Sequence, residues 1–187
     1  IGDEAYEDEL RTALAMGADR AIRVDTAEPL DPWKVACVLS ELARRLEPRL
    51  VLMGKQAVDD DSAQTGQFLA AQLGWPQATF ASQIDDSENG AEVARETDHG
   101  IETLSVTWPA VITADLRLNE PRYASLPGIL AARGKPIQEM SLQELGIEIQ
   151  PRVELIGLQQ VASQRTVRQV ETVTELLDCL RENTELF

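Results

Sequence analysis

The segment 50–73 restricts the fold more than any other part of the chain. An uninterrupted apolar run over residues 50–53 is followed by Gly54 and a polar loop, and an amphipathic stretch then covers residues 66–73. A buried strand that passes through a glycine turn and a polar loop into a helix is typical of open parallel α/β sheets. Ligands of such sheets gather at the carboxyl ends of strands, so this loop is also the first candidate binding site.

The loop carries groups that can bind a nucleotide. It offers glycine N–H groups, hydroxyls, amides, one lysine and three consecutive acids, and the helix start behind it suits a phosphate. Because the acids would repel a phosphate, we expect them to face elsewhere or to bind ribose hydroxyls. The spacing is not that of a Walker loop or a dinucleotide fingerprint, so a plain strand–loop–helix connection remains the alternative. The candidate residues are Gly54, Lys55, Gln56, Ala57, Val58, Asp59, Asp60, Asp61, Ser62, Ala63, Gln64 and Thr65.

The first part of the chain alternates predicted helices with predicted strands, which is the pattern of an α/β fold. Asp31 and Pro32 are typical of an N-cap and a first helical turn. Ile1 and Gly2 resemble the end of a strand, so we expect earlier strands to be missing from this chain. The predicted elements are helices over about 5–16, 32–46 and 66–73 and strands over 21–24 and 50–53.

The pattern changes after residue 74. Residues 92–108 predict a hairpin that protrudes from the α/β body, with His99 in its turn. Two sequences of the capping-box type, at 141–144 and 172–175, predict helical turns, the second opening a helix with an apolar face. The other predicted elements are strands over about 78–84, 111–113 and 153–158 and a short helix over 127–132.

Composition excludes several classes of function. The net charge of −15 argues against nucleic acid and anionic membrane as partners. The apolar runs are too short to cross a bilayer, so no membrane insertion is expected. Cys37 and Cys179 lack a CxxC spacing and are expected to be small buried or half-buried residues in a reducing compartment. His99 is the one histidine, which argues against a histidine-based zinc site or a serine protease triad.

Four ordered segments resemble the beta subunit of electron-transfer flavoprotein. They cover residues 11–20, then 54–65 together with 74–83, and most densely 111–127. The family's signature region corresponds to residues 93–113, where His99 departs from the usual glycine or acid. Members also carry several tens of residues before Arg11, so the resemblance implies that this chain is truncated or partial.

The resemblance implies a Rossmann-like, adenine-nucleotide-binding α/β domain with a mostly parallel sheet. Members are heterodimers, in which the alpha subunit holds most of one FAD and the beta subunit holds a buried AMP. The AMP loop of the family matches residues 54–65 position by position. Gly54 and Gly66 would let the backbone approach the ligand, Gln64 and Thr65 would donate to phosphate, and the three acids would face ribose or cap the next turn.

The resemblance implies three further candidate residues for partner binding. Leu126, followed by Pro127, matches the leucine that enters an apolar pocket of acyl-CoA dehydrogenases. By its own sequence context, Leu126 would only be a hydrophobic staple of a helix. Glu96 lies in the hairpin that approaches the flavin domain, although a hairpin glutamate is often inert. The polar residues between 115 and 122 would connect to this recognition loop, or form an ordinary ion-paired surface.

The implied organisation is a domain over residues 1–150, with a recognition loop over about 115–135, and a C-terminal arm over 151–187 that packs on the partner subunit. The implied function is electron carriage from acyl-CoA and other flavin dehydrogenases to a membrane quinone oxidoreductase, without bond-making chemistry. The location would be the cytoplasm of a bacterium or the mitochondrial matrix of a eukaryote. The alternatives are a bifurcating relative with a second FAD in the AMP site and a free-standing adenine-nucleotide sensor.

Overall fold

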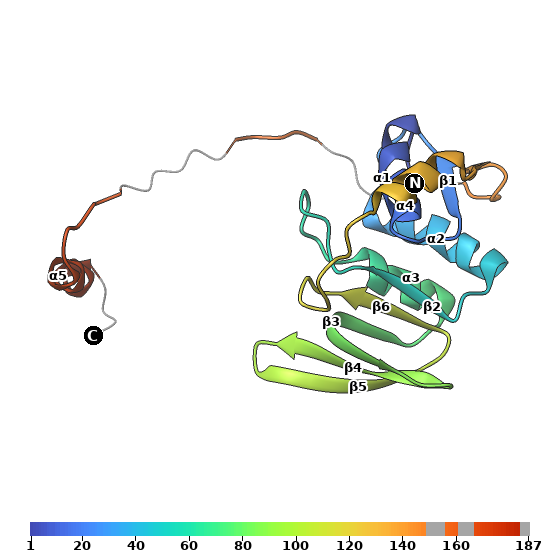
Figure 1. Ribbon diagram of the computed structural model, residues 1–187. Helices are drawn as coiled ribbons and strands as arrows, with labels where there is room; N and C mark the ends of the chain where they lie inside the picture. The colour runs from blue at the N-terminus through green and yellow to red at the C-terminus, as the bar shows by residue number, and fades with distance from the viewer. Residues whose placement is uncertain (149–155, 161–166, 184–187) are drawn as a thin grey trace. The chain divides into compact units, whose positions relative to one another are not determined.

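The computed structural model describes residues 1–148, 156–160 and 167–183, which belong to two units, Ile1–Val153 and Glu154–Phe187. In the first unit a 3-10 turn, Glu4–Tyr6, leads directly into the first helix (Figure 1). The helices of this unit are α1 (Glu7–Ala15), α2 (Pro32–Leu46), α3 (Thr65–Leu73) and α4 (Leu126–Gly134). Its strands are β1 (Ala21–Asp25), β2 (Leu50–Gly54), β3 (Gln77–Asp86), β4 (Gly90–Thr97), β5 (Gly100–Thr107), β6 (Ala110–Ala114) and β7 (Ile137–Ser141).

The described strands form two sheets. Five of them pair in the order β2-β6-β3-β4-β5, and the other two form a separate parallel pair, β1-β7. Within the larger sheet β2, β6 and β3 run parallel, whereas β3, β4 and β5 are antiparallel neighbours. The expected α/β class with a mostly parallel sheet is therefore confirmed, with an antiparallel extension at one side.

Helix α2 packs into the cores of both sheets. Its Ala36 is buried with Leu69 of α3 and Val111 of β6, and α3 lies on β6 and β3 (Figure 1). Its Val38 is buried with Val24 of β1 in a second apolar cluster. The predicted N-cap is present, because the Asp31 carboxylate accepts a hydrogen bond from the Lys34 backbone N–H at 2.8 Å. Burial of alternate faces of one helix thus joins the two sheets.

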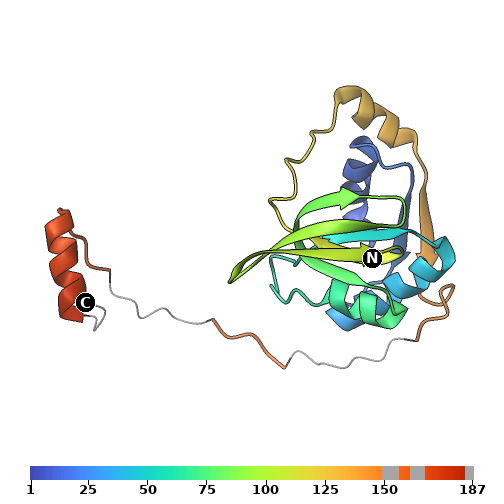
Figure 2. The ribbon, with the colours of Figure 1, turned by 90° about the horizontal axis from the view of Figure 1, so that it is seen from below.

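The predicted hairpin is formed by β4 and β5, with His99 in the turn between them. It continues the larger sheet, because β4 also pairs with β3, from Arg95 with Ala81 to Ala91 with Asp86. Figure 2 shows the two strands extending side by side along one border of the sheet. The sheet is irregular where β3 meets both neighbours, and Phe80 at this point has a left-handed backbone with φ of 60°.

Two parts of the C-terminal half differ from the prediction. Strand β7 was not predicted, because Ile137–Ser141 has no clear alternation of apolar and polar residues. It is a strand because each of its residues pairs with one of β1, from Ala21 with Ile137 to Asp25 with Ser141. The strand expected over 153–158 is wrong at residues 156–158, which have no regular secondary structure, and residues 153–155 lie outside the described residues.

The second unit contains helix α5 (Val173–Asn183). As the capping-box pattern predicts, the Thr172 hydroxyl accepts a hydrogen bond from the Glu175 backbone N–H at 3.2 Å. The Glu175 carboxylate in turn accepts one from the Glu171 backbone N–H at 3.1 Å. Across both units, none of the helices in the described ranges is long and apolar enough to span a membrane.

Candidate functional site

A cavity of about 380 Å³ opens at the carboxyl end of β2. Ten of the twelve predicted loop residues line it, and Val58 and Asp61 do not. Leu30, Pro32 and Val35, which precede or begin α2, also line the cavity. These three residues were not predicted, although they also follow the carboxyl end of a parallel strand, β1. The cavity therefore combines an apolar wall with a polar loop.

The three acids of the loop are engaged within the loop itself. Asp59 accepts a hydrogen bond from the Asp60 backbone N–H at 2.9 Å. Asp60 accepts from both the backbone N–H and the hydroxyl of Ser62, each at 3.1 Å. Asp61 accepts from the side-chain amide of Gln56. These contacts hold a tight loop whose backbone is left-handed at Asp61 and at Ala63.

The two glycines of the predicted loop differ in their surroundings. A Cβ on Gly54 would meet nothing closer than the Gln56 carbonyl oxygen at 3.9 Å. A Cβ on Gly66 would lie 2.4 Å from Cγ2 of Thr113 on β6. Gly66 is buried and does not line the cavity. The structure gives Gly66 a further role, because the lack of a Cβ lets α3 pack closely on the sheet, and its expected approach to a ligand stays a prediction.

The start of α3 faces the cavity with groups that suit an anion. Thr65, the first helical residue, and Gln64, its N-cap, both line the cavity. The Gln64 side chain makes no capping hydrogen bond, and the first helical bond runs from the Phe68 N–H to the Gln64 carbonyl at 3.0 Å. The first N–H groups of a helix have no acceptor within the helix, so they are available to a ligand.

Lys55, the cation of the loop, is directed to a strand end. Its ammonium contacts the Asp115 carboxylate at 2.6 Å and lies 5.6 Å from the centre of the Phe80 ring. Its backbone N–H donates to the Ala114 carbonyl at 3.0 Å. The Lys55 hydrogen bond, followed by that of the Arg117 backbone N–H, lowers the pKa of Asp115 below its ordinary value. Lys55 is thus held between β2, β3 and β6.

The residues after β6 form ion pairs, which agrees with the expected ion-paired surface over residues 115–122. The Asp115 carboxylate accepts a hydrogen bond from the Arg117 backbone N–H at 3.1 Å. The Arg117 guanidinium contacts the carboxylate of Glu96 on β4, and this contact raises the pKa of Arg117. The structure therefore brings the hairpin residue Glu96 and the segment after β6 together.

Leu126 is the first residue of α4 and its side chain is 71% exposed. Ser125 caps this helix, because its hydroxyl accepts a hydrogen bond from the Gly128 backbone N–H at 3.1 Å. Pro127 lies in the first turn of the helix, where the backbone N–H that proline lacks would have had no acceptor within the helix. The exposed apolar side chain is therefore presented on a capped helix end, and neither Leu126 nor Pro127 lines the cavity.

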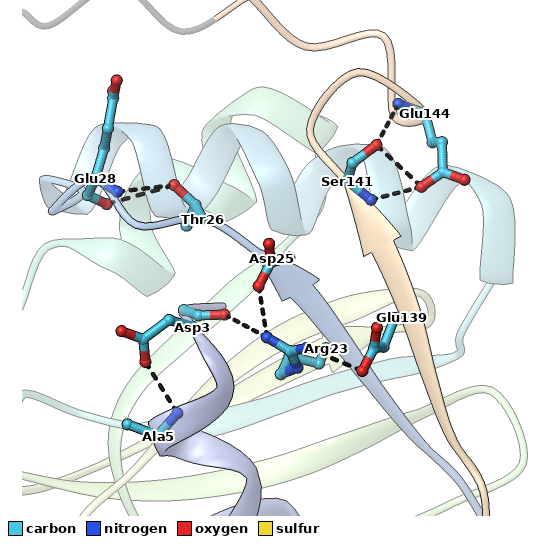
Figure 3. Close-up of polar contacts among 10 residues, drawn as sticks. Asp3, Ala5, Arg23, Asp25, Thr26, Glu28, Glu139, Ser141 and Glu144 are labelled. Carbon is cyan, nitrogen blue, oxygen red and sulfur yellow. Dashed lines mark hydrogen bonds and ion pairs between the residues drawn. The ribbon is translucent and has the colours of Figure 1, made fainter.

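A second charged cluster, not predicted from the sequence, joins β1, β7 and the start of the chain (Figure 3). Its centre is Arg23, whose side chain is only 7% exposed. The guanidinium donates to Glu139 at 2.9 Å, to Asp25 at 2.5 Å and to the Gly2 carbonyl at 3.4 Å. The Glu139 hydrogen bond is the main cause that raises the pKa of Arg23. Because Arg23 does not line the cavity, we assign it to structure.

The cysteines and the histidine add no further chemistry to the described part of the chain. Cys37 and Cys179 are half-buried thiols outside any disulfide, with the half-burial expected, and the Gln72 amide lies 3.5 Å from the sulfur of Cys37. Among the described residues no group of three or more histidine, cysteine or acidic side chains could hold a metal ion. The candidate site is therefore the loop cavity, with Leu126 as a separate exposed apolar residue.

Comparison with known proteins relates this arrangement to one family. The electron transfer flavoprotein domain matches residues 1–145. The mitochondrial electron transfer flavoprotein subunit beta of Arabidopsis thaliana is 48% identical over 188 residues, covering 100% of this chain and 75% of the plant protein. The beta subunit of Bradyrhizobium diazoefficiens is 45% identical over 181 residues, covering 97% of this chain and 73% of the bacterial protein. The human beta subunit is 46% identical over 185 residues, covering 97% of this chain and 72% of the human protein. This chain belongs to the electron transfer flavoprotein family, among its beta subunits.

Proposed function

We propose that this chain acts within a heterodimer that carries electrons from acyl-CoA and other flavin dehydrogenases to a membrane quinone oxidoreductase. Family membership supports the electron-carrier role and an alpha subunit as the partner. FAD, held mostly by the alpha subunit, supplies the redox chemistry, and this chain makes no bonds of its own. Its location is the bacterial cytoplasm or the mitochondrial matrix, according to the organism.

The loop cavity at the end of β2 carries the second part of the proposal, which is that the chain binds AMP. Leu30, Val35 and Met53 offer an apolar surface for the base. Ser62, Thr65 and the free N–H groups of α3 offer donors to the phosphate and ribose. A volume of about 380 Å³ is at the small end for ligand sites, which favours a mononucleotide over a second FAD.

We further propose that Leu126 and Pro127 contact the dehydrogenases and that the arm over residues 151–187 packs on the alpha subunit. An exposed leucine beside a rigid proline loses little freedom when it enters an apolar pocket. On α5, Val173, Leu176 and Leu177 are exposed apolar residues, which supports a packing role for this helix. Glu96 is proposed to lie on the side of the hairpin that faces the flavin domain.

Analysis of the nucleotides in the natural heterodimer tests the AMP proposal. The complex is denatured, and the released nucleotides are separated and quantified by chromatography. We expect AMP and FAD in equal amounts. FAD alone, at twice that amount, would instead support the bifurcating type, and FAD in a single equivalent without AMP would contradict any adenine-nucleotide site in the cavity.

The Thr65→Ala variant tests the position of the ligand. Loss of one hydroxyl partner costs of order 1 kcal/mol, so we expect AMP to dissociate about fivefold more readily. The matched control is Thr103→Ala, which removes an exposed hydroxyl from β5. Equal AMP retention in both variants would place the phosphate elsewhere.

A further inference from the structure

Four charged residues link three separate parts of the chain. Lys55 begins the nucleotide loop, Asp115 follows β6, Arg117 lies two residues later, and Glu96 is on β4. Lys55 contacts Asp115, the Asp115 carboxylate accepts from the Arg117 backbone, and the Arg117 side chain contacts Glu96. We call these four residues the charge chain. It runs from the loop cavity to the hairpin through the segment that leads to α4.

The first contact of the charge chain is held by the backbone on both sides. The Lys55 N–H donates to the Ala114 carbonyl at 3.0 Å, and the Asp115 N–H donates to the Ala81 carbonyl at 2.9 Å. Only 26% of the Lys55 side chain and 17% of the Asp115 side chain are exposed. A partly buried pair on fixed strand ends is screened less by salt than an exposed pair and loses less side-chain freedom.

Asp115 holds two segments with one carboxylate. Its Oδ2 atom contacts Lys55, and its Oδ1 atom accepts the Arg117 N–H. The Leu118 N–H donates to the Asp115 carbonyl at 3.1 Å, which completes a turn at the start of the segment. A change in the position of Lys55 therefore reaches the first turn of residues 115–125 through the Asp115 side chain alone.

We propose that Asp115 is a positioning residue that couples the loop cavity to the segment 115–125. A ligand that orders the loop fixes Lys55, and Lys55 fixes the turn at Asp115. Ordering of this segment then aligns the start of α4, where Leu126 is exposed. The inference rests on the proposed nucleotide site for its ligand, but the link between the two segments is a property of the chain itself.

Coupling of this kind is reciprocal. If a nucleotide in the cavity stabilises the ordered segment, a partner that binds the ordered segment must strengthen nucleotide binding by the same factor. The first ligand has already ordered the residues that both binders share, so less conformational entropy is lost when the second binder associates. An AMP that takes no part in electron transfer would thus still influence how the subunit meets a dehydrogenase.

Hydrogen exchange in the full heterodimer tests the coupling. The variants are Asp115→Asn, Lys55→Met and the charge-conserving Lys55→Arg. The matched control is Glu102→Gln, which breaks the Arg95–Glu102 pair of 2.7 Å on the same sheet outside the charge chain. Without added nucleotide, we expect the backbone amides of both 56–63 and 116–122 to exchange about threefold or more faster in Asp115→Asn and in Lys55→Met than in the parent protein. Lys55→Arg is expected to stay close to the parent protein.

Addition of AMP to nucleotide-depleted heterodimer provides the second arm. In the parent protein and in Glu102→Gln, AMP should slow exchange in 116–122. In Asp115→Asn, AMP should protect 56–63 but leave 116–122 unchanged. The coupling is overturned if Asp115→Asn loosens 116–122 alone, or if AMP protects both segments in that variant. Absence of AMP binding to the parent protein would overturn the proposed ligand, while the ligand-free comparison would still decide the link.

Discussion

At the scale of single residues, Gly66 shows how close packing of a helix on a sheet can require a glycine. A Cβ at this position would lie 2.4 Å from Cγ2 of Thr113, inside any normal contact distance. Both residues are buried between α3 and β6, so neither can move into solvent. We expect Gly66→Ala to lower the free energy of unfolding by about 1–3 kcal/mol, measured by urea denaturation.

Two companion variants isolate the clash. Thr113→Ser removes Cγ2 but keeps the hydroxyl, which accepts a hydrogen bond from the Phe80 N–H at 3.1 Å. The double variant should therefore recover part of the stability that Gly66→Ala loses. Gly134→Ala, at the end of α4 with no atom within 4 Å of its added Cβ, should be neutral or slightly stabilising. A similar loss in both alanine variants would refute the packing explanation.

Leu126 carries the residue-scale prediction for partner binding. Burial of a leucine contributes roughly 1.5–3 kcal/mol, so Leu126→Ala should raise the apparent Michaelis constant for this protein in an acyl-CoA dehydrogenase assay by about tenfold or more. Folding and flavin content should stay unchanged, because the side chain is 71% exposed.

The control for Leu126 is an exposed leucine outside the recognition loop. Leu46, the last residue of α2, is 41% exposed. Its replacement by alanine should leave the dehydrogenase kinetics unaltered. If Leu126→Ala behaves like Leu46→Ala, then Leu126 has no part in recognition, and loss of the folded heterodimer would instead make it a structural residue.

At the scale of elements, the turn after β7 joins this strand to α2 and depends on one carboxylate. Glu144 accepts hydrogen bonds from the Ser141 backbone N–H at 2.6 Å and from the Ser141 hydroxyl at 3.0 Å (Figure 3). Its own N–H donates back to the hydroxyl, which is the reciprocal pattern of a capping box. The Glu144 carbonyl also accepts from Arg45 of α2 at 3.0 Å. The predicted capping box thus stands on a turn and not on a regular helix.

The capping box gives a prediction for the pH dependence of stability. The Ser141 backbone N–H, followed by the Ser141 hydroxyl, lowers the pKa of Glu144 below its ordinary value of 4.5. The charged form is therefore favoured in the folded state, so its contribution is present above pH 4.5 and is lost as the pH falls through the lower folded pKa. We expect Glu144→Gln to destabilise the protein at neutral pH, and the difference from the parent in urea midpoint to shrink as the pH falls below 4.5.

Glu120→Gln serves as the control for this experiment, because Glu120 is exposed and lies in the segment after β6. This variant should show no comparable loss at neutral pH. A Glu144→Gln difference that stayed constant across the acidic range would mean that the side chain acts through packing and not through its charge.

At the scale of the whole first unit, helix α2 connects two structural regions that serve different proposed functions. The cavity lies between the loop after β2 and the start of α2. Leu126 is on α4, which packs on α1 beside the smaller sheet through Leu14 and Ala132. Ala36 and Val38 of α2 are fully buried in different clusters. The proposed nucleotide site therefore lies where α2 meets the larger sheet, whereas the proposed partner contact at Leu126 lies beside the smaller sheet.

Much of the larger sheet could be predicted from the sequence alone. Strands β2 to β6 and helices α2 and α3 follow local signals: continuous apolar runs, alternation, capping residues and turn residues. The loop of the cavity could also be predicted, because it follows a strand at the edge where parallel sheets bind ligands. These features depend on neighbours within a few residues, which is the range that a sequence pattern describes.

Only the tertiary structure decided the features that depend on distant partners. Strand β7 exists through its pairing with β1, more than a hundred residues away, and its own residues show no strand pattern. The wall of the cavity at Leu30 and the charge chain from Lys55 to Glu96 bring together segments that are remote in sequence. By its sequence context Gly66 is a glycine at the end of a loop, and only the structure shows that Thr113 packs against it. Local patterns determine which elements form, whereas long-range pairing and packing decide which side chains meet.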